Sequence, residues 1–144
     1  MQRKEKIIIS SVFLICLIGL MWSFRYFVSQ KTEVSPLEIL PKSQWKELYT
    51  NNKTLGIGQF EYKQRCYKCH GIYGQGSYKG VNLIDDEWIY GSGENDILTS
   101  IYYGRGSMRG YGKKLLPKDL HAITVYVKYL AKAAKEKNQS IQTD

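Results

Sequence analysis

Cys66-Tyr67-Lys68-Cys69-His70 is the stretch that decides the fold of this 144-residue chain. A Cys-x-x-Cys pair followed directly by histidine is the attachment signature of a c-type haem. Each thiol can add across one vinyl group of the porphyrin, and His70 then follows the second attachment point with an imidazole nitrogen for the iron. The motif therefore predicts one haem c, attached covalently through Cys66 and Cys69, with His70 as an iron ligand.

Two other uses of the cysteine pair stay open, and the sequence favours haem over both. A structural zinc site takes about four nitrogen and sulfur ligands, but outside the motif the chain has only Cys16 and His121 to offer. A redox-active dithiol of the thioredoxin type requires a preceding strand within a βαβ frame. Here the preceding residues are polar and helix-like, and the following ones are rich in glycine.

Residues 7–24 are almost unbroken apolar sequence. About 18 such residues are the short end of what a membrane-spanning helix needs. Arg3, Lys4 and Lys6 precede the run, and an excess of positive charge before a span keeps that end in the cytoplasm. We expect one single-pass anchor in the cytoplasmic (inner) membrane, over residues 1–28, with the remaining domain on the periplasmic, extracytoplasmic side.

A cleaved signal peptide is the competing interpretation, because it shares the basic start and the apolar run. No small-x-small cleavage site follows the run, whereas Trp22, Arg25 and Tyr26 resemble the belt of residues found at a membrane interface. The sequence therefore favours a retained anchor, and it does not decide whether the segment is cleaved.

The chain carries a formal net charge of +8 from 21 basic and 13 acidic residues. Without residues 1–28 the balance is 17 basic and 12 acidic, a net charge of +5. Such a charge can steer a domain toward an acidic partner or an anionic membrane surface. The basic residues are scattered instead of clustered, so a nucleic-acid partner is not expected.

The remaining sequence predicts a linker and one helical domain. Residues 29–51 contain Pro36 and Pro41, a small apolar cluster that could dock on the domain or on a partner subunit, and a short helix that Ser43 caps. The helical pattern predicts three further helices, over Leu55–Arg65, over Glu94–Tyr103, and from Pro117 to about Lys137. The first has Ile57, Phe60 and Leu55 on its apolar face. The predicted boundaries are therefore an anchor at 1–28, a linker at 29–51, a cytochrome c domain at 52–137 and a disordered tail at 138–144.

The order of helix, Cys-x-x-Cys-His, glycine loop, helix, methionine loop and last helix resembles the class I cytochrome c family over about residues 52–135. The resemblance implies an all-α class I cytochrome c fold around covalent haem, preceded here by one transmembrane helix. In that family the first helix crosses the last through a glycine and an aromatic residue, which fall on Gly58 and Tyr62, opposite Ile123 and Tyr126. Apolar residues that could form the haem pocket walls are Ile72, Leu83, Ile97, Ile101, Leu115 and Tyr126.

Within that family, the chain resembles the cytochrome c domains of membrane-bound oxidase subunits. The matching features are Asn82-Leu83, Glu87-Trp88, Gly104-Arg105 and Met108. The resemblance implies that Arg105 and Trp88 hydrogen-bond the haem propionates and adds Asn82 to the haem-binding residues. One departure is visible: many members have proline after the methionine, where this chain has Arg109.

Met108 is the expected sixth ligand of the iron. Met1 and Met21 belong to the predicted anchor, so Met108 is the one methionine left for the outer domain. His121 is the rival, although a solvated surface histidine is the commoner case at the start of a helix. Met/His ligation raises the reduction potential of the haem, and it fills both axial positions.

These features predict a membrane-anchored monohaem cytochrome c, an electron-transfer protein and not an enzyme in its own right. It would carry single electrons among redox partner proteins of a respiratory or photosynthetic-type electron transport chain, as a free carrier or as a subunit of an oxidase or quinol-oxidising complex. Two alternatives stay open: a haem-based sensor or enzyme with a labile sixth ligand, and a subunit with a mainly structural role. The sequence names neither the partners nor the potential.

Overall fold

The computed structural model describes residues 14–26 and 36–142. The chain forms two compact units, residues 1–34 and 35–144. In the first unit, residues 14–26 are helical with exposed side chains. Within the two described ranges, no helix is both long and apolar enough to cross a membrane. Parts of the predicted anchor, linker and tail lie outside the described residues, namely 1–13, 27–35 and 143–144.

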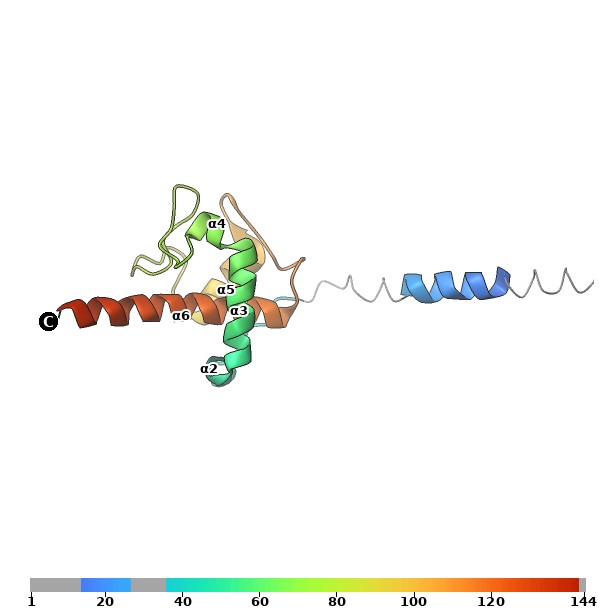
Figure 1. Ribbon diagram of the computed structural model, residues 1–144, viewed down its shortest axis with the longest axis horizontal. Coiled ribbons are helices and arrows are strands. Elements are labelled where there is room, and N and C mark those ends of the chain that lie inside the picture. Colours follow the sequence, from blue (N-terminus) through green and yellow to red (C-terminus); the bar gives the residue numbers. More distant parts are fainter. Residues whose placement is uncertain (1–13, 27–35, 143–144) are drawn as a thin grey trace, which may run out of the picture. The chain divides into compact units, whose positions relative to one another are not determined.

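The second unit is mostly helical, as the sequence predicts (Figure 1). Its helices are α2 (Lys42–Thr50), α3 (Asn52–Arg65), α4 (Tyr67–His70), α5 (Glu94–Tyr103) and α6 (Pro117–Gln142). The sequence did not predict two short antiparallel strands, β1 (Gly104–Arg105) and β2 (Met108–Arg109), which pair Arg105 with Met108. Their tight turn is possible because Gly104 and Gly106 adopt positive φ angles of 82° and 54°.

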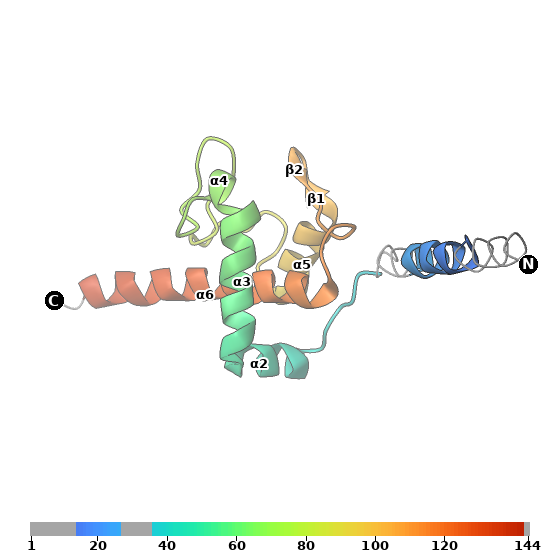
Figure 2. The same cartoon turned by 45° about the vertical axis from the view of Figure 1, so that its right-hand side comes forward.

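The centre of the unit is the crossing of α3 over α6 (Figure 2). A Cβ atom on Gly58 would lie 2.1 Å from the Ala122 carbonyl oxygen, so only glycine allows the two backbones to come this close. The rings of Tyr62 and Tyr126 pack beside the crossing with their centroids 5.3 Å apart. The crossing that the family resemblance implied for Gly58, Tyr62 and Tyr126 is therefore confirmed.

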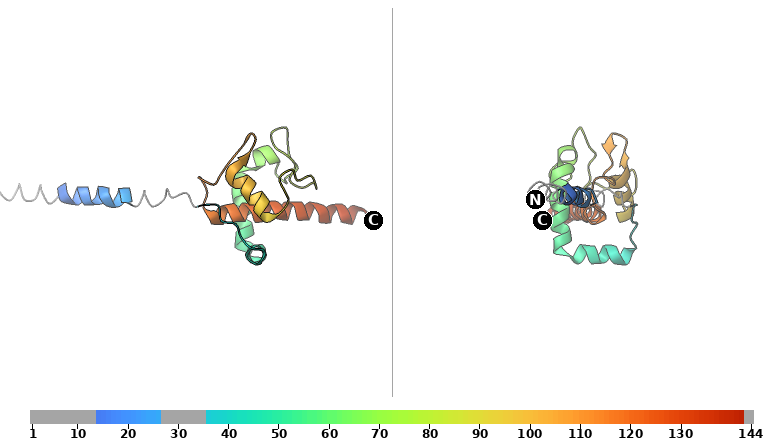
Figure 3. Two further views of the ribbon diagram at one scale, coloured as in Figure 1. Left: turned by 180° about the vertical axis from the view of Figure 1, so that it is seen from behind. Right: turned by 90° about the vertical axis from the view of Figure 1, so that its right-hand side faces the viewer.

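The core consists of apolar side chains from α3, α5 and α6, and α5 lies against α6 (Figure 3). Three of the predicted wall residues, Ile97, Ile101 and Tyr126, are buried, and Leu83 and Leu115 pack against them. Ile72 is 52% exposed, and its contact with haem stays a prediction. One expectation is wrong: Phe60, predicted on the apolar face of its helix, is 60% exposed. The buried face of α3 consists instead of Thr54, Gly58 and Tyr62, whose two small members let α6 approach.

Residues 38–50 belong to the second compact unit. The predicted short helix is confirmed as α2, and the apolar cluster before it docks on the domain through Leu40. Trp45 is 2% exposed and Leu40 is 7% exposed, both within the core. Asn95 on α5 accepts hydrogen bonds from the Leu40 amide (3.3 Å) and the Trp45 indole (3.0 Å), and donates to the Leu40 carbonyl (2.9 Å). The helix begins at Lys42 with Pro41 before it, so Ser43 is not its cap. We call residues 38–50 the strap.

His121 also holds the strap. It is 7% exposed, so the expectation of a solvated surface histidine is wrong. Its Nε2 lies 3.1 Å from the Glu38 carbonyl, and the ring meets Trp45 edge to face at 5.5 Å. A carbonyl can only accept, so this nitrogen carries a proton and donates it.

The last helix continues past Lys137 to Gln142, so residues 138–142 are helical and the predicted disorder is wrong for them. No glycine or proline interrupts this stretch, and an ion pair one turn apart joins Lys132 to Glu136 at 3.7 Å. The Ser140 hydroxyl donates to the Lys137 carbonyl at 2.8 Å. These contacts within the helix stabilise its last turns.

Candidate haem site

The Cys-x-x-Cys-His motif lies where α3 ends and the single turn of α4 begins. The Cys66 amide still donates to the Tyr62 carbonyl (2.8 Å), while the amides of Cys69 and His70 both donate to the Cys66 carbonyl (3.1 and 2.9 Å). This turn brings residues at i, i+3 and i+4 onto one face. Both thiols and the imidazole are therefore presented on the same side of a short helical turn.

His70 is oriented by a backbone contact from the following loop. Its ring is mostly buried, and Nδ1 lies 2.9 Å from the Val81 carbonyl. Because a carbonyl can only accept, Nδ1 carries the proton, and in the neutral ring Nε2 keeps its lone pair. Metal-binding histidines are commonly fixed in this way through their other ring nitrogen.

The two cysteines are free thiols with different surroundings. Cys66 is buried, and burial raises the pKa of its thiol from 9.0 to about 12; Arg65 opposes the rise, while Cys69 and Glu61 add to it. A thiol in this state is a poor source of the thiolate that dithiol exchange uses. The element before the pair is helix α3 and not a strand, which also argues against a thioredoxin-type centre.

Met108 lies on β2, half-buried against the core. The β1–β2 pair and α4 rise from the same side of α6, whereas α2 lies on the opposite side (Figure 2). The loop after β2 is fastened to α5 by hydrogen bonds from the Tyr111 amide to the Ile101 carbonyl (2.9 Å) and from the Gly112 amide to the Tyr102 carbonyl (3.0 Å). The methionine and the motif therefore belong to two elements on one face of the unit.

The other three predicted haem-binding residues have protein partners of their own. Arg105 donates to the Ser100 hydroxyl at 3.2 Å and stacks on the Tyr90 ring at 4.6 Å. Asn82 accepts from the Ile84 amide at 2.8 Å in a local turn. Trp88 packs against the core and lines a separate pocket. Their contacts with haem propionates stay predictions.

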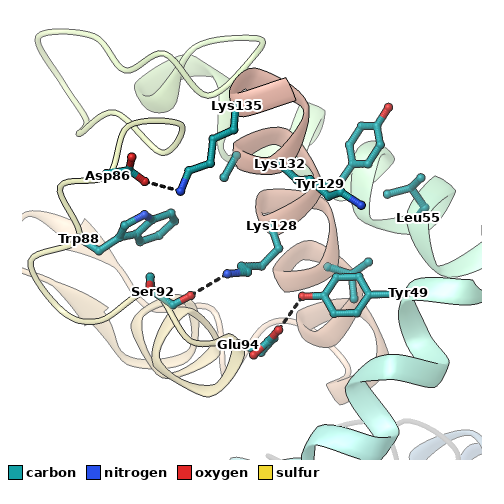
Figure 4. A pocket seen from close by; sticks show the side chains of 12 residues that line it. Tyr49, Leu55, Asp86, Trp88, Ser92, Glu94, Lys128, Tyr129, Lys132 and Lys135 are labelled. Carbon is teal, nitrogen blue, oxygen red and sulfur yellow. Dashed lines mark hydrogen bonds and ion pairs between the residues drawn. The ribbon is translucent and has the colours of Figure 1, made fainter. Parts of the chain in front are cut away.

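That pocket has a volume of about 600 Å³ and lies between α2, α3, α6 and the chain before α5 (Figure 4). Lys135 pairs with Asp86 at 2.5 Å, Lys128 donates to the Ser92 carbonyl at 3.0 Å, and Tyr49 donates to Glu94 at 3.0 Å. None of the motif residues lines it. It is therefore distinct from the site formed by the motif.

Several residues that shape the site were not found from the sequence. Val81 acts through its backbone carbonyl, for which no side-chain pattern exists. The Ser77 hydroxyl donates to the Cys69 carbonyl at 2.6 Å, and the Tyr62 hydroxyl donates to the Gly71 carbonyl at 2.7 Å. The first two contacts join the motif to the glycine-rich loop, and the third joins α3 to the residue after the motif. The glycine content of the loop alone does not specify any of them.

Residues 54–127, just over half of the chain, match the family described as cytochrome c oxidase, cbb3-type, subunit III. The chain belongs to this family. The FixP subunit of the cbb3-type oxidase of Azorhizobium caulinodans is 38% identical over 69 residues, covering 46% of this chain and 24% of the relative. The CcoP subunit from Rubrivivax gelatinosus is 29% identical over 106 residues, covering 72% and 35%. The chain thus spans about a quarter to a third of these relatives.

The fold has a counterpart among solved structures. Cytochrome cL from Methylophaga aminisulfidivorans MPT matches with a TM-score of 0.53 and 22% identity, over 58% of this chain and 64% of that protein. The mostly helical fold is therefore cytochrome c-like, and the resemblance to a c-type cytochrome of oxidase subunits is confirmed.

Cytochrome c families carry covalently bound haem c, and the residues present in this chain fit that group. Two free thiols and an imidazole share one turn, and the His70 tautomer leaves Nε2 available. A zinc site finds less support: among residues 14–26 and 36–142, no group of three or more His, Cys, Asp or Glu side chains is placed to hold a metal ion.

Proposed function

We propose that the chain is a membrane-anchored monohaem cytochrome c that carries single electrons in a respiratory or photosynthetic-type electron transport chain. The observation that carries this proposal is the α4 turn, which presents Cys66, Cys69 and His70 on one face, with His70 held by the Val81 carbonyl. When bound there, haem c supplies reversible one-electron chemistry at its iron.

The protein's part is to hold and orient that group and to keep water from it. Cys66 and Cys69 would hold the haem through thioether links, and His70 Nε2 and Met108 Sδ would bind its iron. Arg105, Trp88 and Asn82 would lie around its edge. His121, the rival ligand, already donates its Nε2 hydrogen to Glu38 within the strap, which supports Met108. Ligation by histidine and methionine raises the reduction potential.

We further propose that the protein works at the outer face of the cytoplasmic membrane with redox partner proteins, as a free carrier or as a subunit of an oxidase or quinol-oxidising complex. The relatives are subunits of cbb3-type cytochrome c oxidases, which supports a place in or beside such a complex. The apolar residues 7–24 with basic residues before them support an N-terminal anchor with its start in the cytoplasm.

The test is a redox titration of the full chain, extracted in detergent, combined with the haem-to-protein ratio. One haem per chain and a single one-electron wave are expected, without prompt binding of carbon monoxide to the reduced form. Rapid carbon monoxide binding would contradict a closed carrier and favour a sensor or enzyme with a labile sixth ligand. Two or more redox waves would contradict a monohaem protein.

A further inference from the structure

The break between α3 and α4 leaves a backbone acceptor next to the attachment turn. The Cys69 amide donates to the Cys66 carbonyl, three residues back, and not to the Arg65 carbonyl one position earlier. The carbonyls at the end of a helix need partners from elsewhere. The Tyr111 hydroxyl supplies one: it donates to the Arg65 carbonyl at 3.3 Å.

Tyr111 belongs to the other side of the site. It follows Met108 by three residues, and its amide is bonded to the Ile101 carbonyl of α5. The backbone thus ties the loop to α5, while the phenol reaches across to the residue that precedes Cys66. This one side chain connects the methionine-bearing loop with the helix that carries the haem attachment.

The electrostatic surroundings agree with this placement. Burial raises the pKa of the Tyr111 phenol, and the nearby Cys66 and Cys69 raise it further, while Arg109 and Arg65 lower it. The raised pKa means that the phenol keeps its proton and remains a hydrogen-bond donor at neutral pH.

We propose that Tyr111 is a positioning residue that holds the Met108 loop closed against the attachment helix and so keeps the methionine at its ligand position. This inference rests on the proposed function. The hydrogen bond exists only when the loop is closed, so its loss must favour the open loop. One such bond contributes enough free energy to shift an equilibrium by about fivefold.

The open population can be measured with imidazole, which competes with methionine for ferric iron. The apparent affinity of a ligand that needs the open state increases in proportion to the population of that state. In the full-length, haem-loaded chain, Tyr111→Phe should bind imidazole about fivefold more tightly than the unchanged protein. The matched control is Tyr103→Phe, because Tyr103 ends α5 beside the same loop but is 64% exposed; it should leave the affinity unchanged.

Three outcomes are informative. Tighter imidazole binding in Tyr111→Phe alone supports the proposal, and a denaturant titration of each variant separates this effect from a general loss of stability. Equal binding in all three proteins overturns the role of Tyr111 while leaving the carrier function intact. If the unchanged ferric protein lacks the weak red-region absorption band of a methionine–iron bond, the proposed ligation fails first, and the inference fails with it.

Discussion

Three side chains around the attachment turn donate hydrogen bonds to backbone carbonyls. His70 donates to Val81, Tyr62 to Gly71 and Tyr111 to Arg65, at 2.9, 2.7 and 3.3 Å. Each bond fixes a side chain against a backbone carbonyl of a loop or a helix end. The precision of the site therefore depends on how the loop folds as well as on the five residues of the motif.

Tyr62 allows the value of such a bond to be measured, because its ring is completely buried. Tyr62→Phe keeps the ring against Tyr126 but removes the shorter of two hydrogen bonds to the Gly71 carbonyl, which also accepts from the Gly74 amide at 3.3 Å. We expect the free energy of unfolding at neutral pH to fall by about 0.5–1.5 kcal/mol. Urea titration of the haem-loaded chain measures the free energy of unfolding. A decrease of less than about 0.5 kcal/mol would contradict the prediction and show that water replaces the hydroxyl without a loss of stability.

The same variant has a pH signature. Burial, followed by Cys66 and Tyr126, raises the pKa of the Tyr62 phenol above its ordinary value of 10.0. A raised pKa in the folded protein means that its contribution to stability is complete below pH 10 and is lost as the pH rises toward the folded value. At about pH 11 the unchanged protein should have lost roughly 1 kcal/mol from this group. An equally steep loss in Tyr62→Phe would assign the dependence to other groups.

Among single residues, the sequence predicts the motif but not the residues that hydrogen-bond around it. Cys66, Cys69 and His70 are recognisable because their spacing is itself the chemical requirement. Val81 and Arg65 take part only through carbonyls, which every residue possesses, so their identities carry no signal. Trp88 and Arg105 were chosen by resemblance, and in the structure both have protein neighbours, the pocket wall and the Tyr90 ring.

At the level of the helices, the close contact of α3 with α6 depends on the absence of a side chain at Gly58. In Gly58→Ala the new Cβ would overlap the Ala122 carbonyl, which belongs to backbone and cannot rotate away. Overpacking typically costs about 1–3 kcal/mol, and the upper end is expected here. Gly56→Ala in the same helix is the control, because no atom lies within 4 Å of its Cβ position and α-helical propensity favours alanine by up to about 1 kcal/mol.

Thermal unfolding of the two haem-loaded variants checks this pair. Opposite shifts are expected, downward for Gly58→Ala and slightly upward for Gly56→Ala. Equal stabilities would mean that the helices separate without penalty and that the crossing does not hold the fold together.

Residues typical of helix starts predict the positions of most helices in the second unit. α5 begins at Glu94 after Gly93, whose amide donates to Asp96 at 3.2 Å, and α6 begins at Pro117. α3 begins three residues before the predicted Leu55, because Asn51 caps it by accepting from the Lys53 and Thr54 amides. The strands at Met108 escaped prediction, since two-residue pairs have too few side chains to show an alternating pattern.

In the second unit as a whole, the strap adds a buried layer that local patterns did not reveal. Its contacts join residues far apart in sequence: Leu40 with Asn95, and Glu38 with His121. A polar asparagine or histidine on a helix is ordinarily a surface residue, so nothing local distinguishes the ones that become buried. Long-range pairing of this kind is visible only in the folded chain.

Asn95 is the residue that fastens the strap. Asn95→Ala would leave the buried Trp45 indole and the Leu40 backbone without partners, at an expected cost of about 2–3 kcal/mol. Hydrogen exchange should then show lost protection in residues 42–50 before α6 opens. Asn138→Ala, on the exposed end of α6, is the matched control and should change stability by less than about 0.5 kcal/mol. Unchanged exchange in the strap of Asn95→Ala would contradict this role.

Covalent haem and methionine ligation are both tested by the optical spectrum of the full chain, oxidised and reduced, beside that of Met108→Ala. We expect a c-type reduced spectrum that survives denaturation because the haem is covalent. We also expect a weak red-region charge-transfer band in the oxidised protein that Met108→Ala loses. Haem that extracts into acidified solvent, or a band that persists in Met108→Ala, would contradict attachment at Cys66 and Cys69 or ligation by Met108.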